Sequence, residues 1–142
     1  MSDTTAEQRD HIEPVYKAKG HVLINGLGIG MVLMNCLEKP EVTRATVVER
    51  SQDVIDLVGP YYKKKYGKRV EIIKADALTY TPPKGIRYGM VWHDIWSDIC
   101  GDNYEQMKKL HRRYGGKCDW QGSWSKRLAR RDYLKSDVNI WM

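Results

Sequence analysis

The residues best placed to do chemistry are the alternating glycines of the segment V-L-I-N-G-L-G-I-G, residues 22–30, and the carboxylate of Glu49. A short apolar run, Val22–Asn25, ends at the glycines, and a helical pattern begins directly behind them. A second apolar run, Ala45–Val48, ends at Glu49, nineteen residues after Gly30. Glycines let backbone approach a ligand closely, and an acid at the tip of the next strand accepts hydrogen bonds from sugar hydroxyls. The spacing therefore predicts a site for a ribose-bearing cofactor.

Two later acids also follow predicted strands. Asp76 comes shortly after Val70–Lys74, and Asp94 ends the apolar run Tyr88–His93. Open α/β sheets bind ligands beyond the carboxyl ends of their strands, so Asp94 is the predicted catalytic residue, able to accept a proton from an attacking amine or to hold an ammonium. Asp76 is explained equally well as the cap of the turn that follows it. His93 and Asp94 are adjacent, and strand alternation predicts that only one of them faces the ligand.

Strand and helix signals alternate along the chain. Strands are predicted at Val22–Asn25, Ala45–Glu49, Val70–Lys74 and Tyr88–His93, with a short fifth at Lys117–Trp120. Helices are predicted at Met31–Leu37, from Ser51 to Gly67 with an interruption at Gly59-Pro60, behind Asp102, and from Ser123 through Arg131. This alternation predicts an α/β fold, a Rossmann-like doubly wound parallel sheet with right-handed crossovers. Residues 1–20 are expected to form a lead-in helix, and residues 21–142 a single domain.

Composition narrows the function classes. Hydrophobic residues make up 42% of the 142 residues and charged residues 30%, which is typical of a globular domain. No apolar run approaches the roughly 20 residues needed to cross a bilayer, and the polar N-terminus lacks a signal-peptide core, so we expect a cytoplasmic protein without a membrane segment. The 3 cysteines and 4 histidines lack disulfide or metal-ligand spacing, so no metal is predicted.

The chain carries a net charge of +6, and its cations are clustered. The clusters lie within residues 63–69, 108–113 and 126–131. Such clusters attract polyanions, but no nucleic-acid-binding motif accompanies them. Solvated helix faces are therefore the favoured interpretation, and nucleic-acid binding is the alternative.

The glycine pattern is G-x-G-x-G rather than the dinucleotide pattern G-x-G-x-x-G, because Met31 occupies the place of the last glycine. From Val22 to about Asp98 the sequence resembles the S-adenosylmethionine-binding core of class I methyltransferase-fold proteins, and more narrowly that of spermidine synthases. The resemblance is carried by V-L-I-N-G-L-G-I-G-M-V-L, by L-E-K-P-E-V-T-R-A-T-V-V-E-R-S-Q-D-V-I and by R-V-E-I-I-K-A-D-A-L-T-Y.

The resemblance implies S-adenosylmethionine as the cofactor and gives each site residue a role. The three glycines would lie under the methionine part and the ribose, and Glu49 would take both ribose hydroxyls. Arg50 or Ser51 would line the adenosine edge, Asp76 and the backbone of Ala77 would contact the adenine amino group, and Asp94 would face the reacting centre. The full predicted cofactor-binding set is Asn25, Gly26, Gly28, Gly30, Glu49, Arg50, Ser51, Asp76, Ala77 and Asp94.

Departures from the spermidine synthase pattern affect the acceptor side. Ile29 stands where those enzymes carry an aspartate, and residues 93–98 read H-D-I-W-S-D in place of D-S-S-D-P, which keeps Asp94 and Asp98 in changed surroundings. The N-terminal β-rich domain is absent, and the closing antiparallel strands do not fit in residues 119–142. The exposed sheet edge that this would leave predicts a homo-oligomer.

The sequence therefore predicts an S-adenosylmethionine-dependent transferase that moves a methyl group to a small-molecule acceptor, with amines among the candidates. Three alternatives stay open. The first is a non-catalytic S-adenosylmethionine-binding module, and the second is aminopropyl transfer to a polyamine. The third is a nucleic-acid methyltransferase guided by a basic C-terminal helix that carries Arg127, Arg130 and Arg131.

Overall fold

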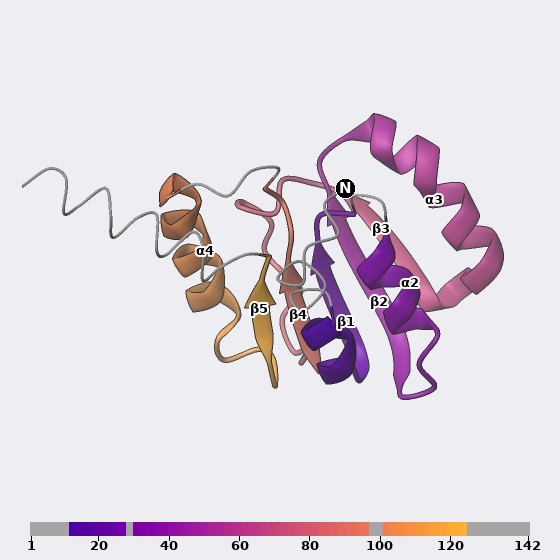
Figure 1. Cartoon of the computed structure of the whole chain (residues 1–142), viewed down its shortest axis with the longest axis horizontal. Helices are drawn as coiled ribbons and strands as arrows, with labels where there is room; N and C mark the ends of the chain where they lie inside the picture. The colour runs from indigo at the N-terminus through magenta and orange to yellow at the C-terminus, as the bar shows by residue number, and fades with distance from the viewer. Residues whose placement is uncertain (1–11, 28–29, 97–100, 125–142) are drawn as a thin grey trace, which may run out of the picture.

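The computed structural model describes residues 12–27, 30–96 and 101–124. They form a five-stranded sheet in the order β3-β2-β1-β4-β5, and every strand pair is parallel (Figure 1). The strands are β1 (Gly20–Asn25), β2 (Val42–Glu49), β3 (Val70–Lys74), β4 (Met90–His93) and β5 (Gln121–Ser123). The predicted doubly wound α/β sheet is confirmed.

Helices cover both faces of this sheet. They are α2 (Met31–Leu37), α3 (Gln52–Tyr66), the short 3-10 helix η1 (Gly67–Arg69) and α4 (Gly101–Tyr114), and residues 12–17 are also helical. Successive residues of a strand point to opposite faces of the sheet, so the strands contribute side chains to two separate cores. One core joins Ile24 and Trp92 to α2 and to Tyr62 of α3, and the other joins Leu23 and Val91 to α4.

The connections reverse direction between β1 and β4. From β1 the chain passes through α2 to β2 and then through α3 to β3. It then returns across the sheet to β4, on the other side of β1. In register, Asn25 lies beside Val48 on one side and His93 on the other. Open α/β sheets bind their ligands at such a reversal, so the edge beyond these strand tips is the first place to look for a site.

Two predicted elements are corrected by the structure. The helix α3 runs without interruption through Gly59-Pro60. Gly59 is buried, and a Cβ there would lie 3.4 Å from Ile72 Cδ1, so packing against the sheet holds the helix together where its local sequence disfavours it. The fifth strand is Gln121–Ser123 rather than Lys117–Trp120, of which Cys118 forms only an isolated bridge with Tyr88.

Other boundaries shift by a few residues. The strand β2 begins at Val42 rather than Ala45, and β4 begins at Met90 rather than Tyr88. Ser123 belongs to β5, and the predicted basic helix behind it lies outside the described residues, as do Gly28, Asp98 and residues 1–11. Among the helices that the structure describes, none is both long enough and apolar enough to cross a membrane.

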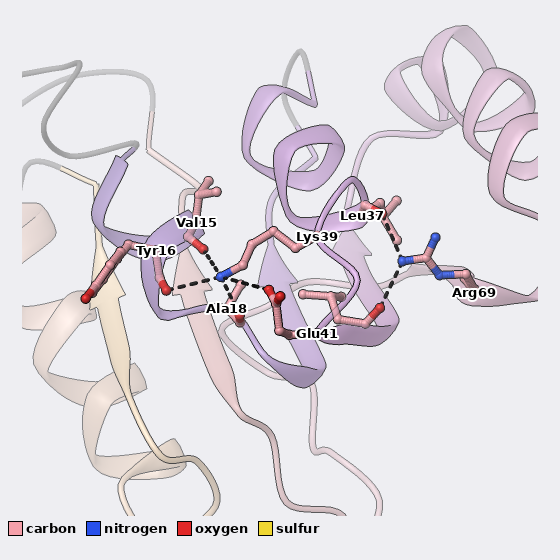
Figure 2. A network of polar contacts seen from close by, with 8 residues as sticks. Val15, Tyr16, Ala18, Leu37, Lys39, Glu41 and Arg69 are labelled. Carbon is pink, nitrogen blue, oxygen red and sulfur yellow. Dashed lines mark hydrogen bonds and ion pairs between the residues drawn. The ribbon is translucent and has the colours of Figure 1, made fainter.

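Two cations fix the ends of neighbouring elements, as Figure 2 shows. Lys39 Nζ donates to the carbonyls of Val15, Tyr16 and Ala18 at 2.7 to 3.1 Å, which holds the end of the helical residues 12–17. The Arg69 guanidinium donates to two further main-chain carbonyls at 2.8 and 2.9 Å, those of Leu37 and Val42. Arg69 therefore ties the end of α2 to the start of β2, so this member of a basic cluster is structural rather than a solvated surface charge.

Replacing Arg69 with methionine is expected to lower the free energy of unfolding by about 2 kcal/mol, because two main-chain carbonyls lose a charged donor. Lys68→Met is the matched control, since Lys68 is exposed on the same 3-10 helix, and its effect is expected to stay within about 0.5 kcal/mol. Urea denaturation followed by circular dichroism measures both. Equal effects of the two substitutions would contradict the role given to Arg69.

Candidate functional site

The carboxylate of Glu49 joins two loops at the tip of β2. Its Oε1 accepts a hydrogen bond from the backbone N–H of Leu27, and its Oε2 accepts one from the backbone N–H of Ser51, each at 2.9 Å. Leu27 belongs to the glycine-rich loop, and Ser51 is the N-cap residue of α3, whose Oγ accepts from Val54 N. The half-buried Glu49 side chain thus holds the loop after β1 against the start of α3.

The glycine loop begins with a close contact between the tips of β1 and β4. Gly26 has a φ of 97°, and a Cβ there would lie 2.1 Å from the backbone oxygen of Asp94. Gly26 N donates to Val48 O and Asp94 N donates to Asn25 O, both at 2.8 Å. Only glycine fits this position, both for its φ and for the space.

Gly30 is required by a different neighbour. It is the N-cap of α2 with a φ of 82°, and a Cβ there would lie 2.4 Å from the hydroxyl of Tyr62. That hydroxyl donates to the carbonyl of Gly30 at 2.7 Å. Burial raises the pKa of Tyr62, which keeps the donor protonated. No local pattern in the sequence indicates this partner, which lies 32 residues along the chain on α3.

Asp94 lines a small pocket at this edge of the sheet. The pocket has a volume of about 40 Å³ and is formed by residues of the glycine loop, of β1 and of α2 together with Asp94. This is room for only a few water molecules, so a larger ligand would extend beyond it along the sheet edge. Asp94 and His93 have different surroundings, since His93 is fully buried and its ring lies 5.1 Å from that of His111 on α4.

The loop after β3 is held by a hydrogen bond of its own residue Asp76 and by Arg113 of α4. Asp76 Oδ1 accepts from Leu78 N at 3.0 Å, the turn contact expected of a capping acid. Arg113, in the last turn of α4, donates to the carbonyls of Ala77, Leu78 and Tyr80 at 2.6 to 3.1 Å. A second member of the basic clusters is therefore structural, and it fixes the segment predicted to contact adenine.

Asn25 lies on the opposite side of the sheet from the pocket. It is fully buried, and its Nδ2 donates to His93 Nδ1 at 2.9 Å. His93 Nε2 in turn donates to Gln121 Oε1 at 3.1 Å, so Nε2 carries a proton. The Asn25 amide therefore connects β1 to β4 and β5 inside the protein, on the face of the sheet away from the pocket.

This buried network continues to α4. His111 Nε2 and Ser123 Oγ lie 2.6 Å apart, and Gln121 Nε2 donates to the carbonyl of His111 at 2.8 Å. The ring of Tyr114 packs 5.5 Å from that of His93, and burial raises the pKa of Tyr114 to about 12. Polar side chains thus connect β4 and β5 to α4, in a cluster that the sequence pattern did not reveal.

The structure brings together part of the predicted set. Gly26, Glu49, Ser51 and Asp94 lie at one edge of the sheet through the contacts given above. Gly30 closes the same loop, while Arg50 is exposed beside Glu49. Asp76 and Ala77 follow β3, whose last residue, Lys74, lies beside Glu49 in register. Within the described residues, no group of histidine, cysteine or carboxylate side chains is arranged to hold a metal ion.

The free acceptor sites of the Glu49 carboxylate suit a sugar diol. A carboxylate has about four lone-pair sites, and the N–H groups of Leu27 and Ser51 occupy two of them. One site on each oxygen is left for a hydroxyl donor. The residues at this edge therefore fit a ribose-bearing cofactor.

Replacing Gly26 with alanine is expected to destabilise the protein more than replacing Gly85. Both residues have positive φ values, 97° and 83°, but a Cβ at Gly85 meets no atom within 4 Å. Gly85→Ala is expected to cost about 1 kcal/mol, and Gly26→Ala about 2 kcal/mol more, because its methyl group overlaps the Asp94 carbonyl. Thermal unfolding measures the difference. Similar midpoints would show that the two strand tips are not held as closely as described.

No protein-family model matches this sequence, and no curated protein matches it. Several solved structures do resemble the fold. The 23S rRNA methyltransferase ErmE matches with a TM-score of 0.62 at 14% identity, over 87% of this chain and 47% of that one. An S-adenosylmethionine-dependent methyltransferase from Clostridium acetobutylicum matches with a TM-score of 0.57 at 13% identity, over 83% and 47% of the two chains.

The N-methyltransferase NodS from Bradyrhizobium japonicum matches with a TM-score of 0.62 at 15% identity, over 92% of this chain and 75% of that one. The chain spans about half the length of ErmE and of the Clostridium protein. At these identities the similarity shows the fold. The chain therefore has the Rossmann-like α/β fold found in these methyltransferases, and the narrower resemblance to spermidine synthases stays a prediction.

Proposed function

We propose that this chain binds S-adenosylmethionine at the edge formed by β1, β2 and β4 and transfers the methyl group to a small-molecule acceptor. The observation that carries the proposal is the Glu49 carboxylate, which is tied to both the glycine loop and the start of α3. It lies beside the reversal in strand order, where this fold class takes its ligands. The fold shared with solved methyltransferases supports the same cofactor.

Glu49 has two tasks in this proposal. Its backbone partners, Leu27 and Ser51, fix the carboxylate before any ligand arrives, so little side-chain freedom is lost on binding. Its remaining lone pairs accept the two ribose hydroxyls, and hydrogen bonds to a charged acceptor in a half-buried position are stronger than those between neutral groups.

The adenine end is assigned to the loop after β3. Arg113 holds three carbonyls of this loop, so its backbone is ordered from the α4 side. Asp76 uses Oδ1 for its own turn, and we assign Oδ2 to the adenine amino group. Arg50 and Ser51, which follow Glu49, line the adenosine edge in this assignment.

Asp94 is assigned to the reacting end. It lines the pocket beside the glycine loop, and its backbone is fixed by the hydrogen bond to Asn25. When bound, the sulfonium supplies an electrophilic methyl carbon, so the protein has mainly to orient an acceptor and to exclude water. Asp94 orients an amine or hydroxyl acceptor through a hydrogen bond and takes the proton that the acceptor loses.

Methyl transfer is favoured over aminopropyl transfer because the acidic pattern that grips a diamine is incomplete. Residues 93–98 keep the acids Asp94 and Asp98, but Ile95, Trp96 and Ser97 stand between them in place of the two serines of D-S-S-D-P. A protein that binds S-adenosylmethionine without transferring any group is the second candidate, and labelled cofactor distinguishes the two.

Glu49→Ala is expected to weaken S-adenosylmethionine binding by more than about tenfold, because two charged hydrogen bonds to the ribose are lost. Isothermal titration calorimetry measures the affinity. Glu41→Ala is the control, since Glu41 is an exposed acid just before the opposite end of β2, and we expect less than about a threefold change. Unchanged affinity in a folded Glu49→Ala protein would refute the site.

Asp94→Asn is expected to keep cofactor affinity within about threefold but to reduce transfer by at least about 100-fold, because an amide cannot take the acceptor's proton. Methyl-labelled cofactor incubated with the protein and a cell extract reports transfer. If the wild-type protein binds cofactor but transfers no label to any extract component, the binding-module alternative holds instead. Equal transfer by both proteins would remove Asp94 from the mechanism.

A further inference from the structure

The outer face of α3 carries an apolar centre that is exposed in the part of the chain that the structure describes. Leu57 is 82% exposed and Tyr61 is 53% exposed, and Pro60 between them is also exposed. Leu57 and Tyr61 are four residues apart, so they lie side by side on the helix. The opposite face of α3 packs on the sheet through Tyr62 and its neighbours. We call Leu57, Pro60 and Tyr61 the α3 apolar centre.

Charge is divided on either side of this centre. The N-terminal half of α3 carries the acids Asp53 and Asp56, and the C-terminal half carries Lys63, Lys64 and Lys65. Lys65 is already paired with Glu38 at 3.3 Å within the chain. The exposed surface thus runs from negative through apolar to positive along one helix.

This arrangement is complementary to itself when reversed. Two antiparallel copies of α3, related by a twofold axis near residue 59, bring Leu57 of one copy against Tyr61 of the other. The same operation places Asp53 of each copy beside Lys64 of the other. A twofold interface has this reciprocal property, since residue i meets j and j meets i.

We propose that the α3 apolar centre and its flanking charges form a homodimer interface with a second copy of this chain. A polyanion fits the face less well, because the acids on the N-terminal half would repel it. Among the described residues, Ile12 and Tyr16 are also strongly exposed apolar side chains, and they belong to the helical residues 12–17 rather than to α3.

The area of the exposed α3 face limits the affinity expected of the dimer. With 15 residues, α3 is about 22 Å long, so one helix pair buries less than the roughly 1,600 Å² of a standard interface. We therefore expect a weak dimer with a dissociation constant in the micromolar range.

Sedimentation velocity of the full chain over a range of concentrations tests the interface. The wild-type protein is expected to pass from monomer to dimer between about 1 and 500 μM. Leu57→Glu combined with Tyr61→Glu should weaken association by more than about tenfold, because charges replace the apolar contact. Tyr16→Ser, which removes an exposed aromatic outside α3, should leave it unchanged.

A charge exchange separates a specific interface from a folding defect. Asp53→Lys places like charges opposite Lys64, and Lys64→Asp places like charges opposite Asp53, so each variant alone should associate several-fold more weakly. An equimolar mixture should regain wild-type association, because every cross-pair is then again opposite in charge. Recovery in the mixture supports the antiparallel arrangement.

Three results would overturn the proposal. The first is a wild-type protein that stays monomeric up to about 500 μM, and the second is a mixture that associates no better than its components. The third is a wild-type monomer that binds a polyuridylate probe in a manner lost with Lys64→Asp, which would assign the basic half to nucleic acid. Since none of these measurements involves S-adenosylmethionine, they stand apart from the proposed function.

Discussion

The contact between the backbones of Gly26 and Asp94 is the constraint on which the candidate site depends. The carbonyl of Asp94 occupies the space in which any side chain on Gly26 would stand. This approach brings the tips of β1 and β4 together at the reversal in strand order. Glu49 then connects the third strand tip, because its carboxylate accepts from both Leu27 and Ser51. The sheet edge is thus organised by main-chain contacts before any ligand is considered.

The two faces of the sheet divide the polar residues near this edge. On one face, Gly26 and Asp94 line the pocket. On the other, Asn25 and His93 are fully buried and bonded to each other. Strand alternation separates neighbours in sequence by the thickness of the sheet. Asp94 therefore lies next in sequence to a buried hydrogen-bonded network. Through His93 and Gln121, this network connects β4 to β5 and α4.

Part of the excess positive charge stabilises the fold. Lys39, Arg69 and Arg113 each donate to main-chain carbonyls at loops and helix ends. Such carbonyls lack partners in regular secondary structure, and a charged donor satisfies them more strongly than a neutral one. Part of the basic composition thus stabilises connections in a small domain, while Lys63 and Lys64 stay on the surface of α3.

Local patterns in the sequence predicted the first four strands, the glycine turn and the acids at the strand ends, because apolar periodicity and turn residues act over a few positions. They placed Glu49 and Asp94 at strand tips and ended a helix at Gly67. Only the tertiary structure decided that α3 continues through Pro60 and that Asn25 faces away from the pocket. Those outcomes depend on packing between distant segments, whose free energy outweighs local preference and leaves no short-range trace in the sequence.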